Sequence, residues 1–222
     1  QHAAATVPRL SERGNDNAVA LRGGDAIQRL KQEGTYDSLA EAVAARAYTF
    51  SRVDPAASPD DTGAYEAPNP AQALSTHFTG DEVRVRSRGE REWQLGLKLT
   101  GWGYGEHLPA VTSGRMQAQG NRIEVRKHAL GSPAASLLVE WYVNPPQGLE
   151  QGFTLSAPPD TIPHAGAPLR VALELTGDLR GEATKDGQAM RLTDRRGWQV
   201  ASYDHLKAWD ATGRELAAHM RV

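Results

Sequence analysis

Two glutamates, Glu140 and Glu150, are the residues whose type and spacing could do chemistry. Glycoside hydrolases use a pair of carboxyl groups about 5–10 Å apart. The break at Pro145 and Pro146 could fold the chain back and bring the two glutamates together. Glu140, however, lies in the alternating pattern of a β-strand, where a solvent-facing glutamate is common. We therefore favour a structural role, and a glycoside-active enzyme using Glu140 and Glu150 is the weaker alternative.

The stretch WYVNPPQGLEQGFTL around these glutamates indicates two strands joined at a sharp break. It begins as a strand, is interrupted by Asn-Pro-Pro, and returns to a strand pattern. A residue that precedes proline is restricted to extended backbone, so the break should be stiff. The residues that we assign to this structural motif are Trp141, Asn144, Glu150, Gln151 and Phe153.

A break of this kind leaves backbone N–H and C=O groups without partners in the sheet. Gln151 offers two donors and an acceptor, whereas Glu150 offers acceptors only. We therefore expect one or both of these side chains to turn inward and to bond main-chain groups of the loop or its neighbours.

No other catalytic or metal-binding pattern is present in the sequence. The seven histidines form no H-x-x-x-H or H-x-H pair, and there is no G-x-S-x-G elbow and no D-x-D-x-D-G loop. The chain has no cysteine, which excludes disulfides, thiolate zinc sites and iron–sulfur clusters. The sequence therefore predicts no catalytic residue, no metal site and no cofactor.

The glycine-rich stretch GWGYG, residues 101–105, does not open a helix and is no phosphate-binding loop. Its glycines would permit a sharp strand bend beside two aromatic side chains. Trp102 and Tyr104 are therefore the candidates for an exposed pair that could stack on a glycan. A tryptophan at a regular strand position, such as Trp93, is more typical of a core.

Composition limits the partners. The net charge is −2, so no basic field draws the chain to nucleic acid. No apolar run approaches the about 18 residues of a membrane span. We expect no nucleic-acid partner and no membrane span.

The first part of the chain has helical patterns. Residues 1–52 are predicted to form an arm with two short helices. Ser38 and Glu41 form a capping box for the second helix. Leu39, Val43 and Ala47 then follow at helical spacing and predict a buried stripe.

The pattern changes after a proline-rich connector, predicted to cover residues 53–70. From residue 71 onward apolar residues alternate with polar ones, which is typical of half-buried antiparallel strands. We predict a mainly β fold, an antiparallel two-sheet β-sandwich over residues 71–222, with a closed barrel as the alternative. The residues expected in its core include Leu95, Leu97, Ile123, Val139, Val171 and Leu173.

Four segments carry a family resemblance: YEAPNPAQALSTHFTGDEVRVRSR, ASLLVEWYVNPPQGLEQGFTLSAPP, RVALELTGDL and LKAWDATGRELAAHMRV. Residues 65–222 resemble an N-terminal β-rich module of large bacterial exported proteins that carry FG-GAP or SBBP-type β-propeller repeats. The resemblance implies a secreted or cell-surface location and a non-catalytic role in assembly or adhesion. It also implies a protein partner, or a downstream β-propeller domain of a longer chain. A glycan-binding module is the alternative.

Overall fold

Alternating apolar and polar residues build the strands that make up most of this chain. The computed structural model describes residues 28, 29, 31, 32, 34, 36–53, 63–131, 137–159 and 167–222. The chain divides into two units, residues 1–43 and 44–222. Helix α2 covers Tyr36–Arg46, and every strand among the described residues lies in the second unit. No helix among the described residues is long and apolar enough to cross a membrane.

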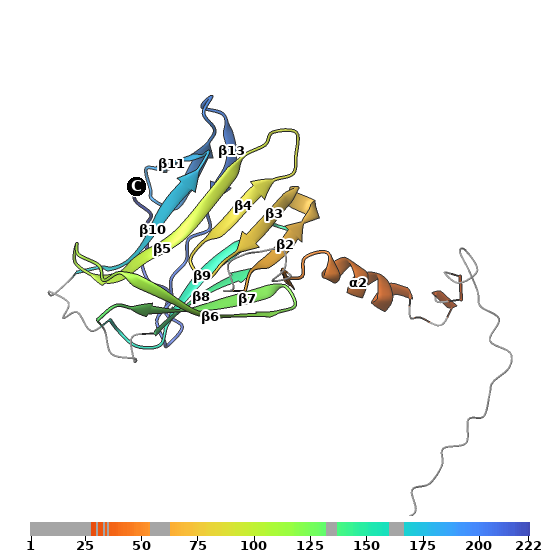
Figure 1. Ribbon diagram of the computed structural model, residues 1–222, viewed down its shortest axis with the longest axis horizontal. Coiled ribbons are helices and arrows are strands. Elements are labelled where there is room, and N and C mark those ends of the chain that lie inside the picture. The colour runs from red at the N-terminus through yellow and green to blue at the C-terminus, as the bar shows by residue number, and fades with distance from the viewer. Residues whose placement is uncertain are drawn as a thin grey trace, which may run out of the picture. The chain divides into compact units, whose positions relative to one another are not determined.

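Sheet A has six strands in the order β1-β2-β3-β4-β5-β10, and every neighbouring pair is antiparallel (Figure 1). Four of its connections are local, whereas β10 returns to pair with β5 after the chain has formed another sheet. The strands of sheet A are β1 (Ser51–Arg52), β2 (Tyr65–Asn69), β3 (Leu74–Phe78), β4 (Val83–Ser87), β5 (Gln94–Tyr104) and β10 (Leu169–Gly177).

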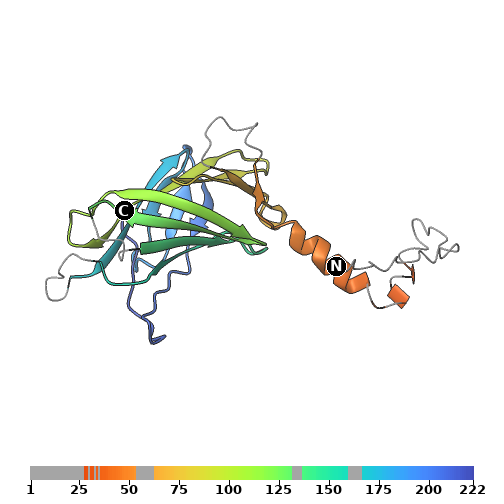
Figure 2. The ribbon, with the colours of Figure 1, turned by 60° about the horizontal axis from the view of Figure 1, so that its bottom comes forward.

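Sheet B is an antiparallel meander of four strands, drawn side by side in colours from yellow-green to teal in Figure 2. Its strands are β6 (Val111–Gln119), β7 (Arg122–Ala129), β8 (Leu137–Val143) and β9 (Glu150–Leu155). Sheet C is a smaller antiparallel meander that follows β10. Its strands are β11 (Arg180–Ala183), β12 (Met190–Thr193) and β13 (Gln199–Tyr203).

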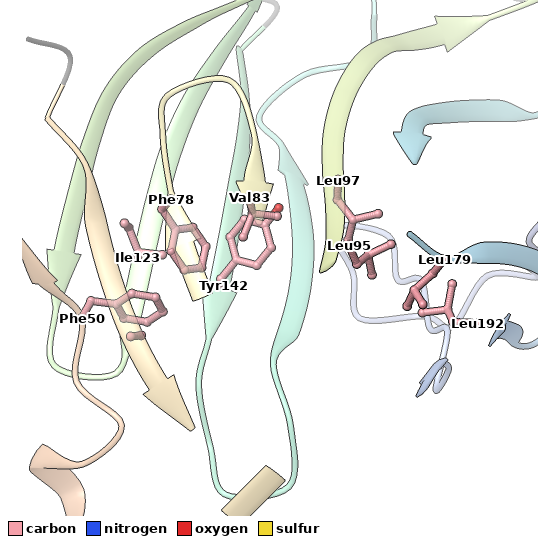
Figure 3. Close-up of a cluster of buried hydrophobic side chains, with 10 residues drawn as sticks. Phe50, Phe78, Val83, Leu95, Leu97, Ile123, Tyr142, Leu179 and Leu192 are labelled. Atoms are coloured by element: carbon pink, nitrogen blue, oxygen red, sulfur yellow. The ribbon is translucent and has the colours of Figure 1, made fainter. Parts of the chain in front are cut away.

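The main core lies between sheets A and B. Phe78 of sheet A packs edge-on against Tyr142 of sheet B, with ring centroids 5.0 Å apart. Phe50 adds a second edge-on contact to Phe78, also at 5.0 Å. Aromatic pairs in this geometry stabilise a core beyond the area that they bury. Ile123 of sheet B is fully buried in the same cluster (Figure 3).

Sheet C closes one end of this core. Leu179 and Leu192 lie in the same buried cluster as Leu95 and Leu97 of β5 (Figure 3). The fold is therefore a β-sandwich of two larger sheets with a third, three-stranded sheet packed against them. The prediction of a mainly β, antiparallel, sandwich-like fold is confirmed, although sheet C was not predicted as a separate sheet.

The predicted core residues divide into two groups. Leu95, Leu97 and Ile123 are buried, as expected. The others, Val139, Leu173 and Val171, are not fully buried. Val171 is 37% exposed because it lies on β10, the last described strand of sheet A, where no neighbouring strand covers it.

The predicted arm and connector are only partly within the described residues. The second predicted helix is α2, and Val43 on it is 64% exposed, so the expected docking of its apolar stripe on the β domain or on another chain stays a prediction. The side chain of Leu39 lies outside the described residues. Within the predicted connector, residues 54–62 also lie outside them, and Tyr65–Asn69 form strand β2.

Candidate functional site

The register of sheet B separates the two glutamates that could have formed a hydrolase pair. Glu140 of β8 lies opposite Phe153 of β9, whereas Glu150 of β9 lies opposite Val143 of β8. Successive side chains of a strand point to opposite faces, so Glu140 and Glu150 lie on opposite faces of the sheet. Glu140 is 4% exposed, and Glu150 is exposed on the outer face. The two-carboxylate site, which was the weaker alternative, is therefore not formed.

Glu140 is paired with a buried lysine. Its Oε2 lies 3.3 Å from Nζ of Lys127, which is 1% exposed. The same Nζ donates hydrogen bonds to the carbonyl oxygen of Gly80 at 2.7 Å and to Oγ of Ser113 at 3.0 Å. Gly80 lies in the turn between β3 and β4, so Lys127 joins sheet B to a turn of sheet A.

Three more side chains, Tyr142, Gln151 and Tyr203, join this ion pair. Together with Lys127 and Glu140 they form what we call the Glu140 network. The hydroxyl of Tyr142 donates to Oε1 of Glu140 at 2.6 Å. Nε2 of Gln151 donates to that same oxygen and to the Tyr142 hydroxyl, both at 2.8 Å. The hydroxyl of Tyr203 on β13 donates to Oε1 of Gln151 at 3.0 Å. The network therefore connects all three sheets.

Burial fixes the protonation of the two phenols. Burial, followed by the charge of Glu140, raises the pKa of Tyr142 well above 10.0. The same two causes raise the pKa of Tyr203 to about 12. Both hydroxyls therefore stay protonated near neutral pH and act as hydrogen-bond donors toward Glu140 and Gln151.

Asn144 holds the break between β8 and β9. This side chain is 1% exposed. Its Nδ2 donates to the carbonyl oxygens of Tyr48 at 3.0 Å and Pro68 at 2.8 Å. Its Oδ1 accepts a 2.8 Å hydrogen bond from Nδ2 of Asn69, which also donates to the carbonyl oxygen of Pro145 at 2.8 Å. We call this contact the Asn69–Asn144 pair.

The backbone of the break is held by neighbouring segments as well. Nε2 of Gln72 donates to the carbonyl oxygen of Pro146 at 2.9 Å. The backbone N–H of Asn144 donates to the carbonyl oxygen of Asn121 at 2.9 Å. Gln151 does turn inward, as predicted, but it bonds side chains and not the main chain. Glu150 does not turn inward.

Trp141 and Phe153 take opposite faces of sheet B. Trp141 lies on the outer face, where its Nε1 donates to Oγ1 of Thr154 at 3.2 Å and the guanidinium of Arg122 lies 4.5 Å from the ring centroid. A Cβ at Gly152 would collide with this indole, so the glycine makes room for it. Phe153 packs inward on a second core cluster, formed by Leu99, Trp102, Ala129 and Leu138.

The prediction that Trp102 is exposed is wrong. Trp102 is 2% exposed and packs in the second core cluster, while Tyr104 is half-buried. β5 continues through the glycine-rich stretch, and a Cβ at Gly101 would lie 2.7 Å from Cβ of Leu108. This glycine therefore allows a loop to approach the strand closely, and it does not expose the neighbouring tryptophan.

Two other tryptophans are exposed. Trp198, beside the β12–β13 turn, is 60% exposed, and Trp209 is 58% exposed. The guanidinium of Arg91 lies 5.3 Å from the ring centroid of Trp198. No group of three His, Asp or Glu side chains in the described part of the chain could hold a metal ion.

No protein-family model, curated protein or solved structure matches this chain. The resemblance to the N-terminal module of exported propeller proteins therefore stays a prediction, and the site is interpreted from its own geometry.

Three residues of these contacts were not predicted from the sequence: Lys127, Tyr203 and Asn69. A signal for Lys127 was present: apolar residues alternate at Ile123 and Val125, and Lys127 occupies the next inward position. A charged residue at an inward position predicts a buried ion pair. No comparable signal marks Tyr203, because its contact with Gln151 crosses between sheets.

We expect the Glu140 network to lower the stability of the fold at alkaline pH. The pKa of Tyr203 is raised from 10.0 to about 12, so the folded chain holds this proton more tightly than the unfolded chain. This stabilisation is present in full below about pH 10 and is lost as the pH rises through the folded-state pKa. The expected loss in the free energy of unfolding is about 2–3 kcal/mol. Urea unfolding between neutral pH and about pH 12 measures this loss.

The matched control for this measurement is Tyr203→Phe, which keeps the ring and removes the titrating hydroxyl. Its free energy of unfolding should fall less over the same pH range, because only Tyr142 then contributes in this direction. An equal fall in the wild-type chain and in Tyr203→Phe would contradict the assignment.

Proposed function

We propose that this chain is a non-catalytic structural and interaction module of a bacterial extracellular or cell-surface protein, with a role in assembly or adhesion. The observation that carries the non-catalytic part is that Glu140 is buried and bonded to neighbouring side chains. This carboxylate accepts hydrogen bonds from Tyr142 and Gln151 and is paired with Lys127. Such a carboxylate supports the fold and is not free to transfer a proton to a substrate.

The contacts of the motif residues support the same proposal. The side chain of Asn144 binds two segments, at Tyr48 and at Pro68 and Asn69, Trp141 covers a glycine on the neighbouring strand, and Phe153 enters the core. These contacts account for four of the five motif residues, since Gln151 also belongs to the Glu140 network. A stretch used in this way supports the fold and does not require a substrate.

The secreted or cell-surface location and the partner rest on the family resemblance of residues 65–222. The proposed partner is another protein, or a β-propeller domain of a longer chain. An interaction module of this kind needs a stiff scaffold, and the polar contacts that join all three sheets supply one.

A glycan-binding module is the second candidate, and the exposed indole of Trp198 favours it. A ring that is 60% exposed beside the guanidinium of Arg91 can stack on a sugar or bind an acidic one. Glycan binding that is lost in Trp198→Ala and kept in Trp209→Ala would favour this candidate.

The variants Gln151→Leu and Glu150→Gln test the non-catalytic assignment. Gln151→Leu should lower the free energy of unfolding by about 1–3 kcal/mol, because it leaves buried polar partners unsatisfied. Glu150→Gln should leave stability nearly unchanged, because Glu150 is exposed on the outer face. Thermal melts of both variants, run beside a screen for glycan hydrolysis, give the answer. A stable Gln151→Leu chain together with hydrolysis lost in Glu150→Gln would overturn the proposal.

The proposed location is tested on intact cells of the producing bacterium. Protease added outside the cells should cleave the protein, because an exported module is accessible there, while a cytoplasmic marker stays intact. A protein that is protected in intact cells and cleaved only after lysis would contradict the cell-surface assignment.

A further inference from the structure

Strand β10 forms a long margin of sheet A. It covers Leu169–Gly177, pairs with β5 on one side, and has no strand on its other side within the described residues (Figure 1). The other margins among the described strands are less suited to pairing: β1, β11 and β13 have only two, four and five residues, β9 contains Gly152, and β6 has a register shift between Ser113 and Met116. An edge strand without proline or a bulge is a template for pairing with another strand.

The register shows which backbone groups of β10 face away from β5. The carbonyl oxygen of Gln94 accepts a hydrogen bond from the backbone N–H of Asp178 at 2.8 Å, so Gln94 faces β10. By alternation the backbone N–H and C=O groups of Lys98 also point toward β10, and those of its register partner Glu174 point toward β5. The irregularity in this pairing is the extra residue Thr100 on β5, so the alternation of β10 itself is kept.

The odd-numbered residues of β10 therefore present their N–H and C=O groups to the free margin. Their side chains point toward the inner face of the sheet, because they lie opposite Leu97, Leu99 and Trp102, which are buried, and Tyr104, which is half-buried. The residues of this set are Leu169, Val171, Leu173 and Leu175. The even-numbered Arg170 and Glu174 place their side chains on the outer face, where both are exposed.

The charges on β10 are self-complementary. If a second copy pairs antiparallel with a two-fold axis at Ala172, Arg170 of each chain lies directly opposite Glu174 of the other. Directly opposed Cβ atoms are about 4.5–5.5 Å apart in an antiparallel pair, close enough for an ion pair. A two-fold axis one residue further, at Leu173, would instead place Arg170 opposite Thr176.

The backbone fits the same axis. With the axis at Ala172, Val171 lies opposite Leu173 of the second copy, and Leu169 lies opposite Leu175 of the second copy. These are the residues whose N–H and C=O groups face the margin, so they can form the hydrogen-bonded pairs of an antiparallel ladder. The pairing would also bring apolar neighbours to Leu169 and Val171, which are 44% and 37% exposed.

From these observations we infer that β10 docks a second copy of this chain, antiparallel and two-fold symmetric about Ala172, so that the two A sheets become continuous. An isologous contact of this kind is self-limiting and gives a dimer. On the outer face Lys98, Glu174 and Arg170 of the second copy then form a row of alternating charge across the sheet. This inference deepens the proposed function, on which it rests, by assigning the interaction module a partner and a surface.

Sedimentation velocity of the whole chain tests this dimer with two charge reversals. Arg170→Glu and Glu174→Arg each turn two attractive cross-strand pairs into two repulsive ones, so each should raise the dimer dissociation constant at least about tenfold. An equimolar mixture of the two variants should recover the dimer, because every opposed pair is then attractive. The chain that carries both reversals should dimerise like the wild type for the same reason.

Arg126→Glu is the matched control, since it reverses an exposed arginine on the central strand β7. It should leave the dimer unchanged, and circular dichroism should show that every variant is folded.

A monomeric wild-type chain, a dimer that neither reversal weakens, or a mixture that does not recover would each overturn the inference. Pairing of β10 with a strand of a different protein would appear as a monomeric wild type. The proposed function would fail in a different experiment, through hydrolysis that is lost in Glu150→Gln. Failure of the dimer is therefore distinguishable from failure of the proposed function.

Discussion

The buried ion pair between Lys127 and Glu140 is the constraint on which the rest of this structure depends. Removing two charges from water costs several kcal/mol for each ion, and their mutual attraction offsets this only when the remaining polar atoms are also bonded. Here Lys127 reaches Gly80 and Ser113, and Glu140 accepts from Tyr142 and Gln151. Among the described residues no buried side-chain nitrogen or oxygen lacks a partner. The pair therefore dictates where the surrounding turns and strands must lie.

The β8–β9 hairpin joins this ion pair to the break that follows β8. Glu140 and Tyr142 point into the core from β8, and Asn144 continues the same inward row just past the end of the strand. Asn144 binds Asn69 and two backbone carbonyls, so the N-terminal strands of sheet A are held at the same place. One short stretch of sequence thus positions parts of the chain that are far apart along it. This is the physical reason that we read the stretch as structural.

The fold class could be predicted from the sequence because alternation is a local property, and strands such as β5 and β7 show it clearly. The faces of Glu140 and Glu150 could not, because the register of β8 against β9 depends on how the chain turns at the Asn-Pro-Pro break. Trp102 was misplaced because glycines beside an aromatic residue permit either a bend or a close approach, and here Leu108 makes the close approach. Sheet C was missed as a separate layer because its contact with β5 is formed only in three dimensions.

A double-mutant cycle on Lys127 and Glu140 tests the account most directly, with the free energy of unfolding as the quantity measured. Lys127→Met and Glu140→Leu should each cost about 3–5 kcal/mol, because each leaves one buried charge unpaired. The double variant should recover most of that loss, since both charges are then gone. Small single effects, below about 1 kcal/mol, that simply add in the double variant would contradict the claim that this ion pair organises the fold.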